Sequence, residues 1–272
     1  MARSVEILIT GQEAKIGEAV LRESAAAATE LGLIVTVSQR YQGGSDWLAL
    51  WGVGEASRDA ARWAQIKAGG YAALWDIGYT NEPGRGKEPG VSYIRVSVNQ
   101  NHPWRFLDRT PNDVSRFNQL GIALREDARA NGPVIVIGMG PKSRTHLGLD
   151  DWEITTLSKA KVRFPERRVL YRPKPRRVMD THINWLLSEG GEIADALRGA
   201  SLVICRHSNV AVDACIAGVP VECEDGAAFW MYRHGADPGE ATRLDFLRRL
   251  AYWQWRTDEQ KEAWTFLQMI CA

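Results

Sequence analysis

The stretch ASLVICRHSNVAVDACIAGVPVECEDG, residues 200–226, has the strand, turn, helix and strand pattern of a parallel sheet. Its apolar run at 202–205 predicts a buried strand, which the polar turn Arg206-His207-Ser208-Asn209 ends. A short helix is expected over 210–217 and a second strand over 219–223. Ligands in open parallel sheets bind at the carboxyl ends of the strands. The stretch therefore predicts an α/β domain with a binding loop at 206–209.

Similar alternation of strand and helix patterns covers most of the chain, with a break at Asn131-Gly132-Pro133. Strands are expected over 5–10, 33–37, 47–51, 71–75, 91–98, 134–137 and 168–171. Helices are expected over 13–31, 55–68, 109–130, 151–161 and 191–197. The fold class predicted is α/β, with two Rossmann-like doubly wound domains that face a cleft, at 1–132 and 133–242. Each would hold a parallel sheet covered on both faces. One or two further helices, over 243–272, are expected to pack back on the first domain.

The composition limits the partners that the chain can be expected to bind. Its 272 residues include 34 Lys and Arg against 33 Asp and Glu, so no global charge attracts nucleic acid or an anionic membrane. No apolar run approaches the roughly 20 residues of a membrane span. The first residues lack the apolar core of a signal peptide, and the four cysteines form no Cys-x-x-Cys pair. We expect a cytoplasmic protein with reduced thiols and no membrane partner.

Tryptophan is unusually abundant, with 11 residues against 6 Phe and 7 Tyr. Most of these rings are expected to fill the core of the first domain and to fasten the terminal helices to it. Trp75 and Trp104 are the exceptions, because either could stack on a substrate.

Three segments of the second domain have the residues of an anion-binding loop, and each follows a predicted strand. They are the glycine turn Gly138-Met139-Gly140-Pro141-Lys142, the stiff basic loop Arg172-Pro173-Lys174-Pro175, and the 206–209 turn. Ordinary helix capping and a solvated basic face are the alternative interpretations of these residues. Because all three loops would converge on one edge of the sheet, the pattern favours a nucleoside diphosphate site.

Residues 200–226 resemble the nucleotide-binding segment of glycosyltransferases with two Rossmann domains, the GT-B class. Further patches resemble small phage-encoded members of that class, namely RVSVN at 95–99, HP at 102–103, GMGPK at 138–142, YRPKP at 171–175 and FLRRLAYWQW at 246–255. The resemblance covers most of residues 133–260. It implies a fold of the GT-B kind and an enzyme that moves a hexosyl or pentosyl group from a nucleoside-diphosphate sugar to an acceptor hydroxyl.

The resemblance also implies which residues bind the donor. His207, Ser208 and Asn209 would contact the diphosphate, and a carboxylate after the phosphate-binding helix would hold the ribose. Glu222, Glu224 and Asp225 are candidates for that carboxylate. The donor-binding residues expected are Gly138, Gly140, Lys142, Arg172, Lys174, His207, Ser208, Asn209, Glu224 and Asp225.

The sequence contains no Asp-x-Asp metal motif, so metal-independent transfer without a further cofactor is expected, with the basic loops neutralising the departing nucleotide. An inverting displacement needs a general base in the first domain, and a retaining one does not. Asp76, expected just after its strand, is the first candidate and His102 the second. Asp46 precedes its strand and lies at the wrong end. The acceptor-binding residues expected are Gly11, Arg95, Asn99 and Trp104.

Hydroxymethylpyrimidine in double-stranded phage DNA is the acceptor that the resemblance favours, in a host cytoplasm. A protein, lipid or polysaccharide acceptor would give a similar sequence. Two other functions stay open: a non-catalytic nucleotide or nucleotide-sugar binding protein, and a sugar-nucleotide epimerase. The sequence gives neither the donor's base and sugar nor the oligomeric state.

Overall fold

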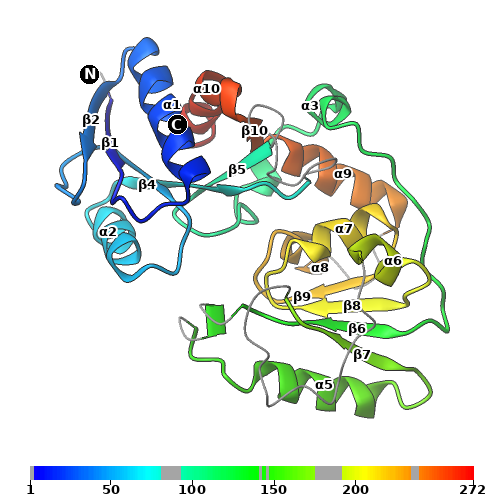
Figure 1. Cartoon of the computed structure of the whole chain (residues 1–272). Coiled ribbons are helices and arrows are strands. Elements are labelled where there is room, and N and C mark those ends of the chain that lie inside the picture. The colour runs from blue at the N-terminus through cyan, green and yellow to red at the C-terminus, as the bar shows by residue number, and fades with distance from the viewer. Residues whose placement is uncertain (1–2, 81–92, 141–142, 145–146, 175–191, 234–238) are drawn as a thin grey trace. The chain divides into compact units, whose positions relative to one another are not determined.

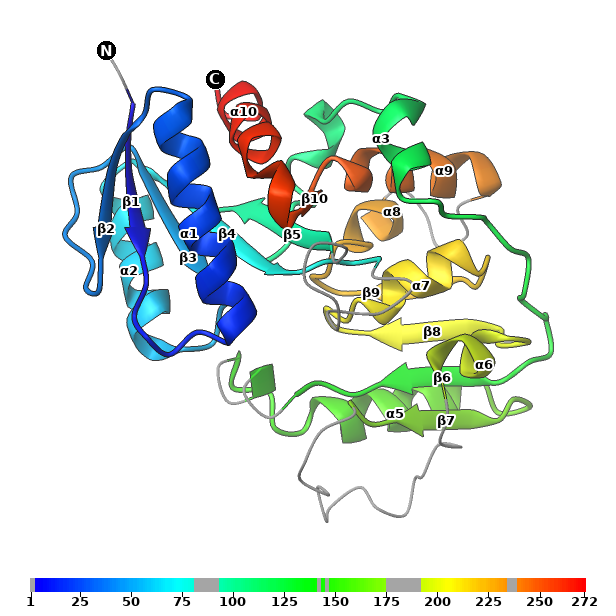
Figure 2. The same ribbon diagram turned by 45° about the horizontal axis from the view of Figure 1, so that its top comes forward.

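A computed structural model describes residues 3–80, 93–140, 143–144, 147–174, 192–233 and 239–272 (Figures 1 and 2). The chain forms two compact units, one of Met1–Arg116 with Arg248–Ala272 and the other of Phe117–Leu247. Each unit has its own mixed or parallel sheet with helices. The domain limits expected from the sequence, at residues 132 and 242, stay predictions.

The described part of the first unit contains a six-stranded sheet in the order β10-β5-β4-β3-β1-β2. Its strands are β1 (Ser4–Leu8), β2 (Ile34–Ser38), β3 (Trp47–Trp51), β4 (Tyr71–Ile77), β5 (Tyr93–Val98) and β10 (Gln254–Arg256). The pairs formed by β1, β2, β3 and β4 are parallel, whereas β5 is antiparallel to both β4 and β10. The expectation of an all-parallel sheet is therefore wrong at this edge. A parallel return from β4 would need a helical crossover, and the Pro- and Gly-rich sequence of 81–90 does not favour one.

The helices of the first unit cover both faces of this sheet. Helices α1 (Lys15–Glu30) and α10 (Gln260–Ile270) lie side by side on one face, and α2 (Ala56–Lys67) lies on the other (Figures 1 and 2). Side chains of a strand alternate between faces. In β3, Leu48 and Leu50 accordingly join the cluster under α2, whereas the ring of Trp47 meets α10.

A tryptophan cluster joins α10 to α1 and the sheet. Trp264 of α10 is fully buried, and its indole N–H donates to Oγ of Ser24 at 2.8 Å and to the Ser24 carbonyl at 3.0 Å. Its ring lies 5.7 Å from that of Trp47 and 5.2 Å from that of Trp75. Trp75 is 1% exposed and donates its indole N–H to Gln260 at 2.8 Å. The expectation that Trp75 could stack on a substrate is wrong, because the ring is part of this core.

Two helices expected from the sequence are not formed as expected. The 3-10 turn Leu107–Arg109 ends where the region 109–130 begins. That region holds the short helix α3 (Val114–Gln119), and residues 122–129 contain no helix. Pro111 and Gly121, which has a φ of 62°, interrupt helical geometry. The backbone N–H groups of Arg125 and Asp127 donate instead to the carbonyls of Ile216 and Ala217, both at 2.8 Å. Within the expected terminal helices, residues 254–256 form the edge strand β10.

The described part of the second unit has four parallel strands in the order β7-β6-β8-β9. They are β6 (Val134–Ile137), β7 (Val169–Arg172), β8 (Leu202–Cys205) and β9 (Val221–Cys223). The helices are α5 (Trp152–Arg163), α6 (Ile193–Leu197), α7 (Val210–Ile216), α8 (Phe229–Arg233) and α9 (Glu240–Ala251), of which α9 extends beyond the unit. Helix α5 lies on one face of the sheet and α6 and α7 on the other (Figure 1). Since the strands are parallel, the loops after β6, β7, β8 and β9 emerge at one edge.

No helix in the described ranges is long and apolar enough to cross a membrane.

Replacing Trp264 by Ala should lower the free energy of unfolding by about 3–5 kcal/mol, because it opens a cavity beneath α10 and leaves Ser24 without its donor. Urea denaturation measures this loss. Trp63→Ala is the matched control, because that ring is 58% exposed and should change stability by less than about 0.5 kcal/mol. Equal losses in the two variants would contradict the assignment of Trp264 to the core.

The bond between Arg116 and Glu259 gives a pH-dependent contribution to stability. The guanidinium donates to both carboxylate oxygens, at 2.8 and 2.7 Å. Burial raises the pKa of Glu259, but the hydrogen bonds and charge of Arg116 and the Arg256 N–H outweigh it, so the pKa falls below its usual 4.5. At neutral pH, Glu259→Gln should cost about 1 kcal/mol. The difference should shrink as pH falls through the folded-state pKa, because protonation then removes the pair in the native protein as well. Urea denaturation at several pH values checks this, and a constant difference would contradict it.

Candidate functional site

The carboxyl edge of the second sheet brings together the three loops that the sequence selected. The backbone N–H of Gly138 donates to the carbonyl of Arg172 at 2.9 Å. A side chain placed on Gly140 would lie 3.5 Å from Cδ and 3.9 Å from Nζ of Lys174. From the loop after β8, His207 lies with its Nε2 3.2 Å from Oγ of Ser143, just beyond the glycine turn. The glycine turn, the basic loop and the His207 loop are therefore neighbours, and Lys142 lies outside the described residues.

The glycine turn is held by a buried acid that sequence reasoning missed. Glu153, near the start of α5, is fully buried and accepts a hydrogen bond from the N–H of Met139 at 3.0 Å. The guanidinium of Arg144 lies 3.8 Å from the same carboxylate oxygen. Glu153 sits inside a helical pattern, so nothing local distinguishes it from a solvent-facing residue.

Two of the carboxylates that were expected to bind the ribose accept hydrogen bonds from Arg206 in this structure. Arg206 donates through Nε to Asp225 at 3.0 Å and through Nη1 to Glu224 at 2.7 Å. The indole N–H of Trp152 donates to the second oxygen of Glu224 at 2.8 Å. These four side chains form a network that reaches from α5 to the loop after β9.

The turn before α7 shows only part of the capping chemistry that was the alternative to phosphate binding. The hydroxyl oxygen of Ser208 accepts from the N–H of Val210 at 3.2 Å. Asn209 is the first residue before the helix, and its side chain makes no capping bond. Both side chains are half-buried.

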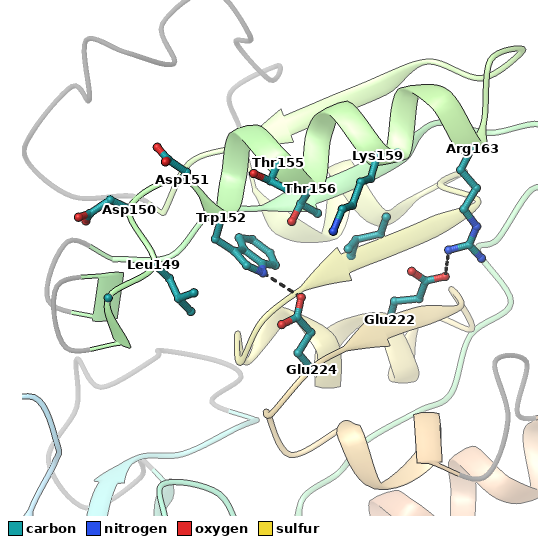
Figure 3. A pocket seen from close by; sticks show the side chains of 13 residues that line it. Leu149, Asp150, Asp151, Trp152, Thr155, Thr156, Lys159, Arg163, Glu222 and Glu224 are labelled. Carbon is teal, nitrogen blue, oxygen red and sulfur yellow. Dashed lines mark hydrogen bonds and ion pairs between the residues drawn. The ribbon is translucent and has the colours of Figure 1, made fainter.

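A pocket of about 740 Å³ opens beside this network, between α5 and the face of β8 and β9 (Figure 3). It is lined by Gly148, Leu149, Asp150, Asp151, Trp152, Thr155, Thr156, Lys159, Ala160, Arg163, Ile204, Glu222 and Glu224. One end lies at the bond between Trp152 and Glu224, and an ion pair of 2.6 Å between Arg163 and Glu222 lies at the other (Figure 3). The sequence suggested the two glutamates as ligand-binding residues but assigned no ligand contact to a residue of α5. Only the arrangement of α5 on the sheet reveals them.

The expected catalytic residues lie in the first unit, near the end of β4. Asp76 is inside this strand and not after it, because β4 continues to Ile77. Its side chain is 29% exposed and accepts from Arg95 at 2.6 Å. Burial lowers the pKa of Arg95, but the Asp76 carboxylate and Tyr79 outweigh this and raise it above its usual value. Arg95 is only 6% exposed. The buried guanidinium of Arg95 therefore fixes the position of the more exposed Asp76 carboxylate.

The second catalytic candidate, His102, is connected to the first through this arginine. His102 is 4% exposed, and its Nδ1 lies 3.0 Å from the hydroxyl of Tyr79. Asn101 accepts from Arg95 at 3.0 Å, and its amide nitrogen lies 3.4 Å from Nε2 of His102. Asp76, Arg95, Asn101, His102 and Tyr79 therefore form one cluster, in which Asp76 is more exposed than His102.

The other expected acceptor-binding residues have local partners. The N–H of the exposed Gly11 donates to Glu13 at 2.9 Å. Asn99 has a φ of 62°, and its side-chain oxygen accepts from the N–H of Ala72 at 2.8 Å. The half-buried ring of Trp104 has the guanidinium of Arg105 5.0 Å from its centroid. Gly11 and Asn99 shape turns here, and their contact with an acceptor stays a prediction.

Across the described residues, no group of three His, Cys, Asp or Glu side chains is arranged to hold a metal ion.

No family model and no curated protein matches the sequence. The fold is similar to a structure of Thermosulfurimonas dismutans KpsC, a beta Kdo 2,4 transferase, with a TM-score of 0.51 and 12% identity. That match covers 93% of this chain and 92% of that chain. The beta Kdo 2,7 transferase of the same organism's KpsC gives a TM-score of 0.49 and 12% identity, over 98% of this chain and 100% of that one. At 12% identity the first likeness shows the fold alone.

The close approach of the glycine turn to Tyr171 can be tested with a pair of substitutions. A Cβ at position 138 would lie 2.4 Å from Oη of Tyr171, a buried ring, so Gly138→Ala should cost about 1–3 kcal/mol of stability. Gly140→Ala places its Cβ at an ordinary 3.5 Å from the flexible Lys174 and should cost under about 0.5 kcal/mol. Thermal or urea denaturation of both variants measures the difference in stability. Equal stabilities would contradict the close approach of Gly138 to Tyr171.

Proposed function

We propose that the chain is a glycosyltransferase with two Rossmann-like domains of the GT-B kind, which binds a nucleoside-diphosphate sugar at the carboxyl edge of the β7-β6-β8-β9 sheet. One observation carries the proposal. The Gly138–Gly140 turn, Lys174 and His207 meet at that edge, beside a pocket of about 740 Å³. Basic side chains beside a glycine turn suit phosphate, and the pocket has the size of a ligand site.

Within this proposal, the donor's diphosphate contacts the glycine turn, Arg172, Lys174 and the 207–209 turn. Its nucleoside enters the pocket at the end formed by Trp152 and Glu224, where the carboxylate can accept from ribose hydroxyls. The basic residues neutralise the charge that develops on the nucleotide as the sugar leaves. We therefore propose that transfer needs no metal ion, which is tested by activity in the presence of a chelator.

Asp76 is the general base that the geometry favours. The Asp76 carboxylate is partly exposed, and the buried Arg95 fixes its position. This carboxylate can therefore accept the proton of an acceptor hydroxyl. His102 is buried and bonded to Tyr79, which fits a supporting role better. This assignment applies to an inverting displacement.

The function is tested by incubating the full chain with nucleotide-activated sugars and weighing the products by mass spectrometry. The donors include nucleotide-activated Kdo, since Kdo transfer is named for the KpsC structure. One arm contains DNA with hydroxymethylpyrimidines, the proposed acceptor, and others contain glycan acceptors. A sugar added to an acceptor with release of the nucleotide is expected. Donor conversion without any acceptor would indicate an epimerase, and tight binding without turnover a nucleotide-binding protein. Either result would overturn the proposal.

The role of Asp76 gives a sharper prediction. Asp76→Asn should lower kcat by about 10²–10⁴-fold while donor binding stays unchanged, because the amide cannot accept the proton. Asp46→Asn is the matched control, since Asp46 bonds to Ser4 at the opposite end of the parallel strands and should retain turnover. Steady-state kinetics and calorimetric donor titration separate the two effects. Wild-type turnover in the Asp76 variant would remove this residue from the mechanism.

A further inference from the structure

Ser143, His207 and Asp225 form a row of side chains at the carboxyl edge of the second sheet. Nε2 of His207 lies 3.2 Å from Oγ of Ser143, and its Nδ1 lies 3.6 Å from Oδ1 of Asp225. Each residue comes from a different strand-end loop, after β6, β8 and β9 respectively. The imidazole is therefore held between a hydroxyl and a carboxylate.

The carboxylate in this row has one oxygen available for the imidazole. Oδ2 of Asp225 accepts from Nε of Arg206 at 3.0 Å. Oδ1 is buried and, within the described residues, accepts no hydrogen bond. A buried carboxylate oxygen without a donor is costly, and the ring nitrogen 3.6 Å away is placed to supply the proton after a small movement.

Backbone contacts fix this pairing independently of the side chains. The N–H groups of Glu224 and Asp225 both donate to the carbonyl of Arg206 at 3.0 Å. Gly226 lies against the backbone of His207, where an added Cβ would be 3.0 Å from Cα. The loop after β9 is thus locked to the loop after β8 at the point where Asp225 faces His207.

We propose that Asp225 is a positioning residue for His207: it holds the Nδ1 proton and so directs Nε2, beside Ser143, toward a phosphate of the donor. The proposal rests on the proposed function and changes the role of Asp225, which the sequence assigned to the ribose. With phosphate bound, His207 is an imidazolium whose two N–H groups donate to Asp225 and to a phosphate oxygen. The hydroxyl of Ser143 turns from the ring to the same phosphate.

Charged groups from four loops lie around His207. Asp225 faces it from the loop after β9, and Arg206 beside it is neutralised by Asp225 and Glu224. Arg144 follows Ser143 and lies near the buried Glu153, and Lys174 lies at Gly140 in the neighbouring loop. During transfer, the bond between the sugar carbon and the phosphate oxygen breaks with its electron pair going to oxygen. The Nε2–H group then donates to a phosphate that carries more negative charge, and this hydrogen bond strengthens.

Inorganic pyrophosphate is the probe, titrated calorimetrically into the full chain at neutral pH. His207→Gln should weaken binding, because it removes the ring whose Nε2–H would donate to phosphate. Asp225→Asn should weaken binding about tenfold, because the ring then loses its carboxylate partner. Asp195→Asn is the control: it removes one negative charge from an exposed pair with Arg198 and should behave as wild type.

The tautomer of His207 gives a readout that a merely structural role would not change. In ¹⁵N NMR spectra of the free protein at high pH, the wild-type ring should carry its proton on Nδ1, with His207→Gln identifying the signal. Asp225→Asn should give a mixture of tautomers, because an amide can also donate to Nδ1. Asp225→Glu should restore the Nδ1–H form and most of the affinity, and Ser143→Ala should keep that tautomer while weakening binding a few-fold.

The outcomes separate this inference from the proposed function. If pyrophosphate does not bind the wild-type chain, the proposed donor site is wrong and the inference fails with it. If pyrophosphate binds, but Asp225→Asn keeps the wild-type affinity and tautomer, the inference alone is overturned. Should Asp225→Asn not fold, Asp225→Glu with near wild-type affinity and the Nδ1–H tautomer supports the inference, and loss of both in that folded variant refutes it.

Discussion

Parallel strands that end at one edge are the constraint on which the candidate site depends. In the part of the chain that the structure describes, four such strands form the second sheet, so loops far apart in sequence emerge together. This geometry places the Gly138 turn against Arg172 and His207 beside Ser143. These contacts need only two features of the sequence. One is a glycine at position 138, where the ring of Tyr171 comes close, and the other is polar residues at the ends of the strands.

Several charged groups at this edge have partners within the protein. Arg206 is paired with Glu224 and Asp225, and the N–H of Met139 is occupied by the buried Glu153. For the diphosphate that we propose to bind here, the order of these loops before binding lowers the ordering cost.

The first unit depends on a different feature, a tryptophan core that α10 covers. Trp264, Trp75 and Trp47 fill the space beneath α10. The indole N–H of Trp264 donates to Ser24, and that of Trp75 donates to Gln260. The sequence predicted tryptophans as packing residues but misjudged Trp75, because a strand end is buried or open according to the helix that covers it. The Asp76 and Arg95 pair lies on the opposite face, where antiparallel β5 sets the two side chains directly across from each other.

The sequence by itself determined the buried strands, the glycine turn and the polar residues at strand ends, because these depend on local periodicity and backbone preference. Only the tertiary structure decided the antiparallel edge of β5 and β10 and the irregular run at 122–129, since both depend on hydrogen bonds to distant segments. It also decided the partners of Ser143, Glu153 and Asp225. Their pattern in sequence is that of any polar residue in a turn or helix, and their chemistry arises from what lies across the sheet edge.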